Sequence, residues 1–264
     1  MKNIVSKIAT ILALAVVAVY PASAITNGEL DGDGHPYVGI MVAIDENGDP
    51  RWRCSGALIS PTVYVTAGHC TESPAVTAEI WFAADVESGI PGNGYPFVGE
   101  VSGTAWTSPA YNPNAFFLND LGVVLLDEPV VLDEYATLVE EAGQLNALKT
   151  RRGLQNQTFT AVGYGLQQIN PVFIQAERVR MVATPHLIQI NVPGFTGDFS
   201  ILLSNNHSTG GTCFGDSGGP NFIGDSNVIG GVTSFGINGN CAGTGGVYRL
   251  DRQHDLEWLN DFLE

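Results

Sequence analysis

Basic residues are scarce in this chain of 264 residues. Lysine and arginine together number 11, against 27 aspartates and glutamates, which gives a formal net charge of −16. The longest basic run is the pair Arg151-Arg152. This argues against a nucleic-acid partner, because phosphate contacts need clustered Lys and Arg. Charged residues of both signs make up only 14% of the chain, whereas soluble domains typically carry about 25%.

Cysteine is limited to four residues, and the usual metal-binding spacings are missing. No C-x-x-C or H-E-x-x-H motif occurs, so we expect neither a zinc site nor any other metal or cofactor. Cys54 and Cys70 lie in the first half of the chain, and Cys213 and Cys241 lie in the second. This distribution favours pairs within each half, but spacing alone leaves three connectivities open.

Long apolar runs are also missing, apart from one near the N-terminus. Lys2 and Lys7 precede the uncharged run Ile8–Val19, and the sequence Ala22-Ser23-Ala24 follows. This pattern predicts a signal peptide over residues 1–24, because the run is too short to span a bilayer comfortably. A retained membrane anchor is the alternative. Cleavage would take the net charge to −18 and leave a secreted protein, extracellular or periplasmic, with no membrane association.

The rest of the chain is rich in glycine and in β-branched residues. Its 32 glycines, with turn sequences such as Asn47-Gly48-Asp49-Pro50, separate short apolar runs. This composition predicts an all-β fold, a sandwich or a barrel, rather than alternating strands and helices. The predicted strands are Tyr37–Ile44, Ala57–Ile59, Val63–Ala67, Ile80–Ala84, Gly122–Leu126, Thr158–Val162, Glu177–Val182, Ile201–Leu203, Val228–Ser234 and Gly246–Leu250.

A helical pattern ends the chain. Leu256, Leu259 and Leu263 recur at positions i, i+3 and i+7, which predicts an amphipathic helix. Asp251, just before this run, is the candidate N-cap residue.

Three segments carry candidate catalytic residues. His69 ends an apolar run in Thr66-Ala67-Gly68-His69-Cys70, Asp120 opens a buried strand, and Ser217 lies in a glycine-rich turn. A serine hydroxyl needs a nearby base to act as a nucleophile, and a histidine can serve near pH 7. An aspartate must then hold the other nitrogen of the ring. The order His69, Asp120, Ser217 is the order of the chymotrypsin triad.

These segments resemble the signatures of the chymotrypsin/trypsin-like serine protease family. TAGHC (66–70), NDLGVVLL (119–126) and GDSGGP (215–220) match its three main motifs, and the resemblance covers nearly all of residues 25–264. Further matches, in order, are Ile25-Thr26-Asn27-Gly28, Cys54-Ser55-Gly56, Gly163-Tyr164-Gly165, Ser234-Phe235-Gly236 and Gly246-Val247-Tyr248.

The resemblance implies a fold and a division of the chain. The fold is two packed six-stranded antiparallel β-barrels followed by a C-terminal α-helix. After the signal peptide (1–24), the first barrel spans 25–135 with His69 and Asp120, the second spans 136–250 with Ser217, and the helix spans 251–264. The disulfides implied are Cys54–Cys70 and Cys213–Cys241, and the backbone N–H groups of Gly215 and Ser217 are implied to form the oxyanion hole.

The resemblance also locates the S1 pocket, which binds the residue before the scissile bond. Its expected residues are Gly211, Thr212, Ser234, Phe235, Gly236 and Gly246. Gly211 occupies the family's position at the bottom of the pocket, so no carboxylate there supports a preference for Lys or Arg. Glycine at 236 and 246 leaves the pocket open. The expected substrates are therefore proteins or peptides with a large apolar or aromatic residue at this position, and the expected enzyme is a monomer.

Activation in this family usually exposes an N-terminal Ile whose ammonium pairs with the aspartate before the serine. Ile25 and Asp216 are the corresponding residues. The predicted leader ends at Ala24, so removal of the signal would itself create the Ile25 terminus. We therefore expect no separate zymogen.

Two other functions remain open on the sequence. The first is a catalytically silent relative that acts as a binding module, although no triad residue is missing. The second is an α/β-hydrolase, because Gly215–Gly219 also fits G-x-S-x-G. That class needs a helix after the serine and a histidine further on, and only His254, inside the predicted terminal helix, follows Ser217.

Overall fold

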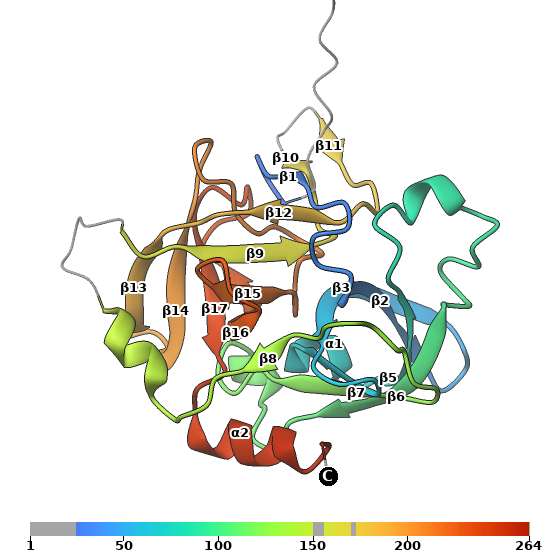
Figure 1. Ribbon diagram of the computed structural model, residues 1–264, viewed down its shortest axis with the longest axis horizontal. Helices are drawn as coiled ribbons and strands as arrows, with labels where there is room; N and C mark the ends of the chain where they lie inside the picture. The colour runs from blue at the N-terminus through green and yellow to red at the C-terminus, as the bar shows by residue number, and fades with distance from the viewer. Residues whose placement is uncertain (1–24, 150–155, 170–172, 264) are drawn as a thin grey trace, which may run out of the picture.

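The computed structural model describes residues 25–149, 156–169 and 173–263 (Figure 1). The predicted signal peptide and the Arg151-Arg152 pair lie outside these residues. Two β units lie side by side, and a helix lies at the C-terminal end. No helix in the described ranges has the length and apolarity needed to cross a bilayer.

The first unit is a closed barrel of six antiparallel strands, in the order β2-β3-β4-β7-β6-β5. All residues of β2 are buried, and neighbouring strands pair with both of its edges. The Asn47-Gly48 turn follows it, where the Asp45 carboxylate accepts the N–H groups of Asn47 and Asp49 at 2.9 and 3.0 Å. The strands are β2 (Val38–Asp45), β3 (Pro50–Leu58), β4 (Val63–Thr66), β5 (Ala75–Trp81), β6 (Val101–Thr107) and β7 (Gly122–Leu126).

The second unit is a curled nine-stranded sheet in the order β1-β12-β9-β15-β16-β17-β14-β13, with β8 beside β16. Within the described residues no strand pair closes it into a ring. Its strands are β1 (Glu29–Leu30), β8 (Thr137–Leu138), β9 (Phe159–Gly163), β12 (Met181–Ala183), β13 (Leu187–Val192), β14 (Gly197–Asn205), β15 (Pro220–Ile223), β16 (Val228–Gly236) and β17 (Gly243–Arg249). A separate hairpin joins β10 (Gln168–Ile169) and β11 (Ile174–Gln175).

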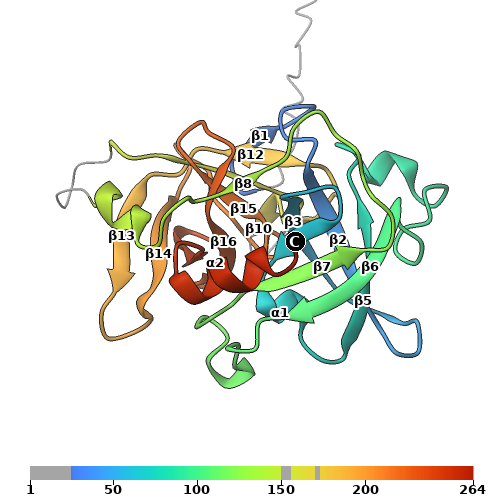
Figure 2. The same ribbon diagram turned by 60° about the horizontal axis from the view of Figure 1, so that its bottom comes forward.

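The helices are short. They are α1 (Gly68–Thr71), the 3-10 turns η1 (Glu87–Gly89), η2 (Pro113–Ala115) and η3 (Gln144–Leu148), and α2 (Gln253–Asn260). Figure 2 shows α2 lying across the junction of the two units. Arg252, at its start, lies over the Phe199 ring of the second unit, and Phe262, just past its end, contacts Trp106 of the barrel.

The expected N-cap of α2 is wrong. Its N-cap residue is Arg252, which makes no side-chain capping bond. Asp251 instead pairs with Arg249 at 2.7 Å and accepts the N–H of Leu145 at 2.8 Å. A buried arginine attracts this carboxylate away from the helix end, since an unpaired buried charge costs more than a missing cap.

The strand predictions differ from the structure in both units. Gly122–Leu126 agrees fully, but β3 begins at Pro50 rather than at Ala57, and β5 covers Ala75–Trp81 rather than Ile80–Ala84. Strands β6 and β13 were not expected at all. In β6, the sequence VSGTAWT has few large apolar residues, and its pairing with β5 and β7 holds it in the barrel.

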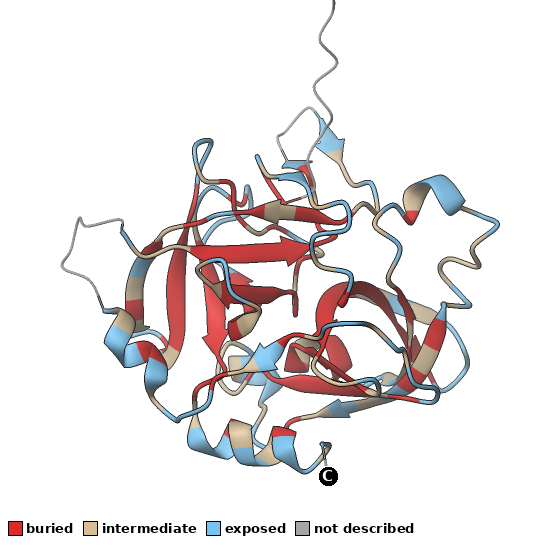
Figure 3. Cartoon of the chain, viewed as in Figure 1, coloured by how far each residue is buried: buried red, intermediate tan, exposed pale blue. Residues whose placement is uncertain are grey.

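The junction between the units is tied by backbone and side-chain hydrogen bonds. The N–H of Ser55 in β3 donates to the carbonyl of Ser217 at 2.8 Å. The hydroxyl of Tyr164, just after β9, donates to the carbonyl of Ala83 at 2.9 Å. Figure 3 shows buried residues in the strands of both units. The candidate catalytic residues therefore come from both β units, and these hydrogen bonds fix the units relative to each other.

Candidate active site

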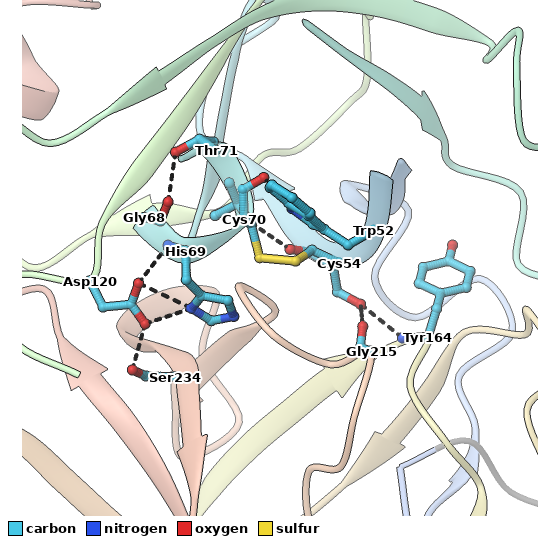
Figure 4. The surroundings of a disulfide bond; sticks show 12 residues. Trp52, Cys54, Gly68, His69, Cys70, Thr71, Asp120, Tyr164, Gly215 and Ser234 are labelled. Carbon is cyan, nitrogen blue, oxygen red and sulfur yellow. Dashed lines mark hydrogen bonds and ion pairs between the residues drawn. A yellow bond between two sulfur atoms is a disulfide. The ribbon is translucent and has the colours of Figure 1, made fainter. Parts of the chain in front are cut away.

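His69 and Asp120 are brought together by two paired strands. His69 lies in α1, which follows β4, and Asp120 lies just before β7, the partner of β4. His69 Nδ1 lies 2.9 Å from one carboxylate oxygen of Asp120 and 3.1 Å from the other (Figure 4). The backbone N–H of His69 also donates to Asp120, at 2.9 Å. The pair is therefore fixed at both the ring and the backbone.

The Asp120 carboxylate is fully buried and receives one more bond. The hydroxyl of Ser234 donates to it at 2.5 Å (Figure 4). Burial alone would lower the pKa of His69, but the charge and hydrogen bond of Asp120, with the charge of Glu72, raise it above its usual 6.5. A buried acceptor of this kind fixes the orientation of the ring and stabilises the imidazolium.

Ser217 lies in the tight turn between Cys213 and Pro220. Gly215 and Gly218 have φ angles of +95° and +77°, which favour glycine. The N–H of Gly218 donates to the carbonyl of Thr233 at 2.8 Å, which ties the turn to β16. Across the described residues, the Ser217 hydroxyl has no hydrogen bond to His69. Such contacts are often long before substrate binds.

Two backbone donors beside Ser217 have no acceptor. Within the part of the chain that the structure describes, neither the N–H of Gly215 nor that of Ser217 donates to any protein atom. The carbonyl of Gly215 is fixed instead, because it accepts a hydrogen bond from the Ser55 hydroxyl at 3.0 Å. Ser55 Oγ also accepts the N–H of Tyr164 at 3.0 Å. The two free N–H groups are thus available to an oxygen placed next to Ser217.

A cavity of about 410 Å³ opens beside Ser217. Four of the six expected pocket residues line it: Thr212, Ser234, Phe235 and Gly236. The other two lie outside its lining. Any side chain on Gly211 would collide with Asn205, and the ring of Phe235 covers Gly246. Further lining residues that the sequence did not single out are Phe116, Phe214, Ile237, Asn238 and Thr244.

Among the described residues, the cavity wall carries no charged side chain, and it combines hydroxyl and amide groups with large apolar side chains. Phe116, Phe214 and Ile237 are 39%, 54% and 57% exposed, so they present ring and alkyl surface at the rim. The sequence could not identify them, because each comes from a loop whose position depends on the packing of both units. The sequence feature that they share is a large apolar residue beside a motif, and it is too common to identify a pocket residue.

Asp216 and Ile25 are both fully buried. Asp216 accepts the N–H groups of Cys213 and Gly165 at 2.8 and 2.7 Å. Burial raises its pKa to about 7, although these two bonds and the charge of Arg53 act in the opposite direction. Within the described ranges, no hydrogen bond or ion pair joins Ile25 to Asp216.

The structure contains the disulfides Cys54–Cys70 and Cys213–Cys241, the pairs that the family resemblance implies. The first lies beside His69 (Figure 4), and the second lies at the cavity wall. Cys54, Cys70 and His69 lie close enough to suggest a metal cluster, but both sulfur atoms are bonded to each other and are not thiolates.

Comparison with known proteins defines the class first. HL collagenase has a TM-score of 0.68 and 22% identity to this chain, and the match covers 90% of this chain and 97% of that one. Human heparin binding protein has a TM-score of 0.66 and 20% identity, with 90% and 96% covered. The fold is therefore that of the chymotrypsin-like serine proteases, as the motifs predict.

The sequence comparisons give the family. The family model described as Trypsin matches residues 31–252. Brachyurin of Leptuca pugilator is 29% identical over 203 residues, which cover 73% of this chain and 80% of the relative. Since the family model spans more than half of the chain, the chain belongs to the trypsin family of serine endopeptidases.

Proposed function

We propose that this chain is a secreted serine endopeptidase that cleaves peptide bonds through Ser217, His69 and Asp120. The observation that carries the proposal is the fully buried Asp120 carboxylate holding the His69 ring at 2.9 Å. The two unpaired N–H groups of Gly215 and Ser217 add to it. The pair of cysteine bridges fits an oxidising compartment outside the cytosol.

The proposed chemistry follows from these roles. His69 takes the proton of the Ser217 hydroxyl as the oxygen attacks the carbonyl carbon, and Asp120 stabilises the imidazolium. The N–H groups of Gly215 and Ser217 stabilise the oxyanion, and such a donor is typically worth about 3–4 kcal/mol. His69 then gives its proton to the leaving amine, and water hydrolyses the acyl-enzyme by the same steps in reverse.

The proposed specificity is for large apolar or aromatic residues before the scissile bond. The cavity beside Ser217 is of side-chain size, uncharged, and lined by Phe116, Phe214 and Phe235. Gly211 does not line it, so the specificity is better tested at Thr212, which does. A cleaved peptide library should show Phe, Tyr, Leu or Met at this position, and Thr212→Asp should add cleavage after Arg and Lys. A parent enzyme that already prefers Arg or Lys would contradict this specificity.

A silent binding module is the alternative, and no observation here favours it. The fold alone does not decide between them, since human heparin binding protein shares it. A polyanion such as heparin requires clustered cations, whereas this chain carries a net charge of −16. The test is a labelled fluorophosphonate on the folded secreted protein. Labelling of Ser217 supports the peptidase, and an unlabelled folded protein supports the binding module.

The pH dependence provides a further prediction. His69 must be neutral to accept the serine proton, and Asp120 and Glu72 raise its pKa above 6.5. Activity should therefore fall on the acid side with a midpoint above pH 6.5, measured as kcat/KM against pH. Glu72→Gln removes one of these charges and should move the midpoint to lower pH. Glu128→Gln, an exposed acid, is the control. An identical midpoint in parent and Glu72→Gln would contradict the role of Glu72.

A further inference from the structure

Arg53 is the exception among the arginines that the structure describes. Each of the others forms an ion pair with a carboxylate, and Arg53 forms none. Its guanidinium makes a single hydrogen bond, of 3.4 Å, to the carbonyl of Ala176. An unpaired, partly buried cation is unusual in a chain with 27 acidic residues and 11 basic ones. The paired arginines are Arg51, Arg178, Arg180, Arg249 and Arg252.

The guanidinium lies against the glycine that supplies an unpaired N–H. A methyl group placed on Gly215 would lie 3.3 Å from Arg53 Nε and 3.6 Å from Nη2. Strand geometry agrees with this position, because residues two apart share a face, and the hydroxyl of Ser55 also contacts Gly215. Arg53 does not line the cavity beside Ser217. A substrate whose side chain fills that cavity places its scissile bond beside Ser217 and Gly215, so Arg53 adjoins the bond from outside the pocket for the preceding residue.

We propose that Arg53 forms a subsite for a substrate carboxylate located one or two residues after the scissile bond. The inference rests on the proposed peptidase function and adds a substrate class to it. The carboxylate belongs either to an Asp or Glu side chain or to the C-terminus of a short peptide. A partly buried guanidinium suits this partner, since it donates several N–H groups in a planar fork that matches a carboxylate.

The competing role for Arg53 is electrostatic support of buried Asp216. The charge of Arg53 opposes the rise in the pKa of Asp216 and also lowers the pKa of Glu87, but it contacts neither carboxylate. Support of Asp216 would act on the turn around Ser217 and hence on every substrate alike. A substrate subsite would act only on substrates that carry the carboxylate. The ratio of two substrates within one enzyme separates these roles.

The experiment compares quenched fluorescent peptides with Phe before the scissile bond. The first comparison places Glu or Gln at the first residue after the scissile bond, and then at the second. The second comparison uses peptides that end two residues after the bond, in either a free carboxylate or an amide. The ratio of kcat/KM, acid over neutral, is measured for the parent, for Arg53→Gln and for Arg51→Gln. Arg51 lies on the same strand, is exposed and pairs with Asp45, so it is the matched control.

The parent should favour the acidic peptide roughly three- to tenfold, as expected for a partly desolvated charge pair. The preference should persist in Arg51→Gln, disappear in Arg53→Gln, reverse toward Lys in Arg53→Glu, and weaken with salt. If the preference appears with Glu against Gln, the carboxylate is a side chain; if it appears with the free acid against the amide, it is the C-terminus. If the parent hydrolyses neutral peptides but shows no preference for acidic ones, the subsite is wrong and the peptidase function stands. The same conclusion follows if Arg53→Gln lowers kcat/KM equally for all peptides. No hydrolysis of any peptide by the parent overturns the peptidase function and the subsite with it.

Discussion

Ser217→Ala is expected to remove almost all peptidase activity while leaving a folded, secreted protein. The hydroxyl makes no hydrogen bond to another described protein atom, so its loss leaves no buried partner unsatisfied. The effect on kcat should be about a million-fold, because members of a triad act as a unit. The measurement is hydrolysis of a Phe-containing peptide, with circular dichroism and thermal unfolding to show that the fold is intact.

Ser208→Ala is the matched control for this variant. Ser208 is exposed in the loop after β14, and it should leave both activity and stability unchanged. Residual activity in Ser217→Ala reflects what binding and the oxyanion hole supply without the nucleophile. Parental activity in the Ser217→Ala protein would end the assignment of the nucleophile, whatever the fold.

The sequence predicted the fold class and the family because both depend on short motifs with fixed neighbours. Gly122–Leu126 is a continuous apolar strand after Asp120, and β7 has these bounds. The strand β5 begins earlier than predicted, because Ala75–Glu79 contains a single large apolar residue, Val76, and its pairing with β2 and β6 makes it a strand. The four-residue helix α1, which carries His69, is too short to have a periodic signal.

Parts of the candidate site depend on contacts between distant residues and could not be predicted. The sequence shows Ser55 only as part of a motif, yet its hydroxyl donates to the carbonyl of Gly215, 160 positions further along the chain. Ser234 was expected in the pocket wall, which it lines, but its hydroxyl also bonds to Asp120. The cover of Gly246 by the Phe235 ring likewise follows from the register of β16 on β17.

The segment that begins at Ile25, after the predicted leader, is inserted into the second unit in a way that supports activation by cleavage after Ala24. Thr26 forms a β-bridge with Gly211, and its hydroxyl bonds to Asn205 at 2.8 Å. The Ile25 side chain packs with Ala161 of β9, and the carboxylate of Asp216 lies against Gly163, two residues along the same strand. Since residues two apart face the same way, the Ile25 side chain and the Asp216 carboxylate both adjoin the same face of β9.

The backbone conformation of Ile25 gives a second reason to link activation to cleavage after Ala24. Its φ is +57°, which is costly for a β-branched residue that follows a peptide carbonyl. An N-terminal residue has no preceding carbonyl, so cleavage after Ala24 would remove this strain. The new ammonium would also lie close to a buried carboxyl group whose burial raises its pKa to about 7. We therefore propose that signal cleavage and activation are one event.

A form extended by one residue before Ile25 should lose activity by roughly a hundred- to a thousandfold, the effect of losing an oxyanion donor. N-terminal sequencing of the active secreted enzyme should begin at Ile25, and Asp216→Asn should resemble the extended form. Adding one residue at the C-terminus is the control. An active enzyme that begins elsewhere, or full activity in the extended form, contradicts the proposal.

The two forms should also differ in the pH range over which they lose stability. In the extended form, Asp216 has a folded pKa of about 7 against an ordinary 3.8, so its contribution to stability is complete below pH 3.8 and is lost as the pH rises to about 7. In the form that begins at Ile25, the ammonium offsets this loss. Its own pKa, ordinarily about 7.7–8, is raised by Asp216, so the pair is intact below that range and fails as the pH rises through the folded value. Thermal unfolding from pH 4 to 10 should thus decline early in the extended form and only at alkaline pH in the other, whereas matching profiles would show that Ile25 and Asp216 do not pair.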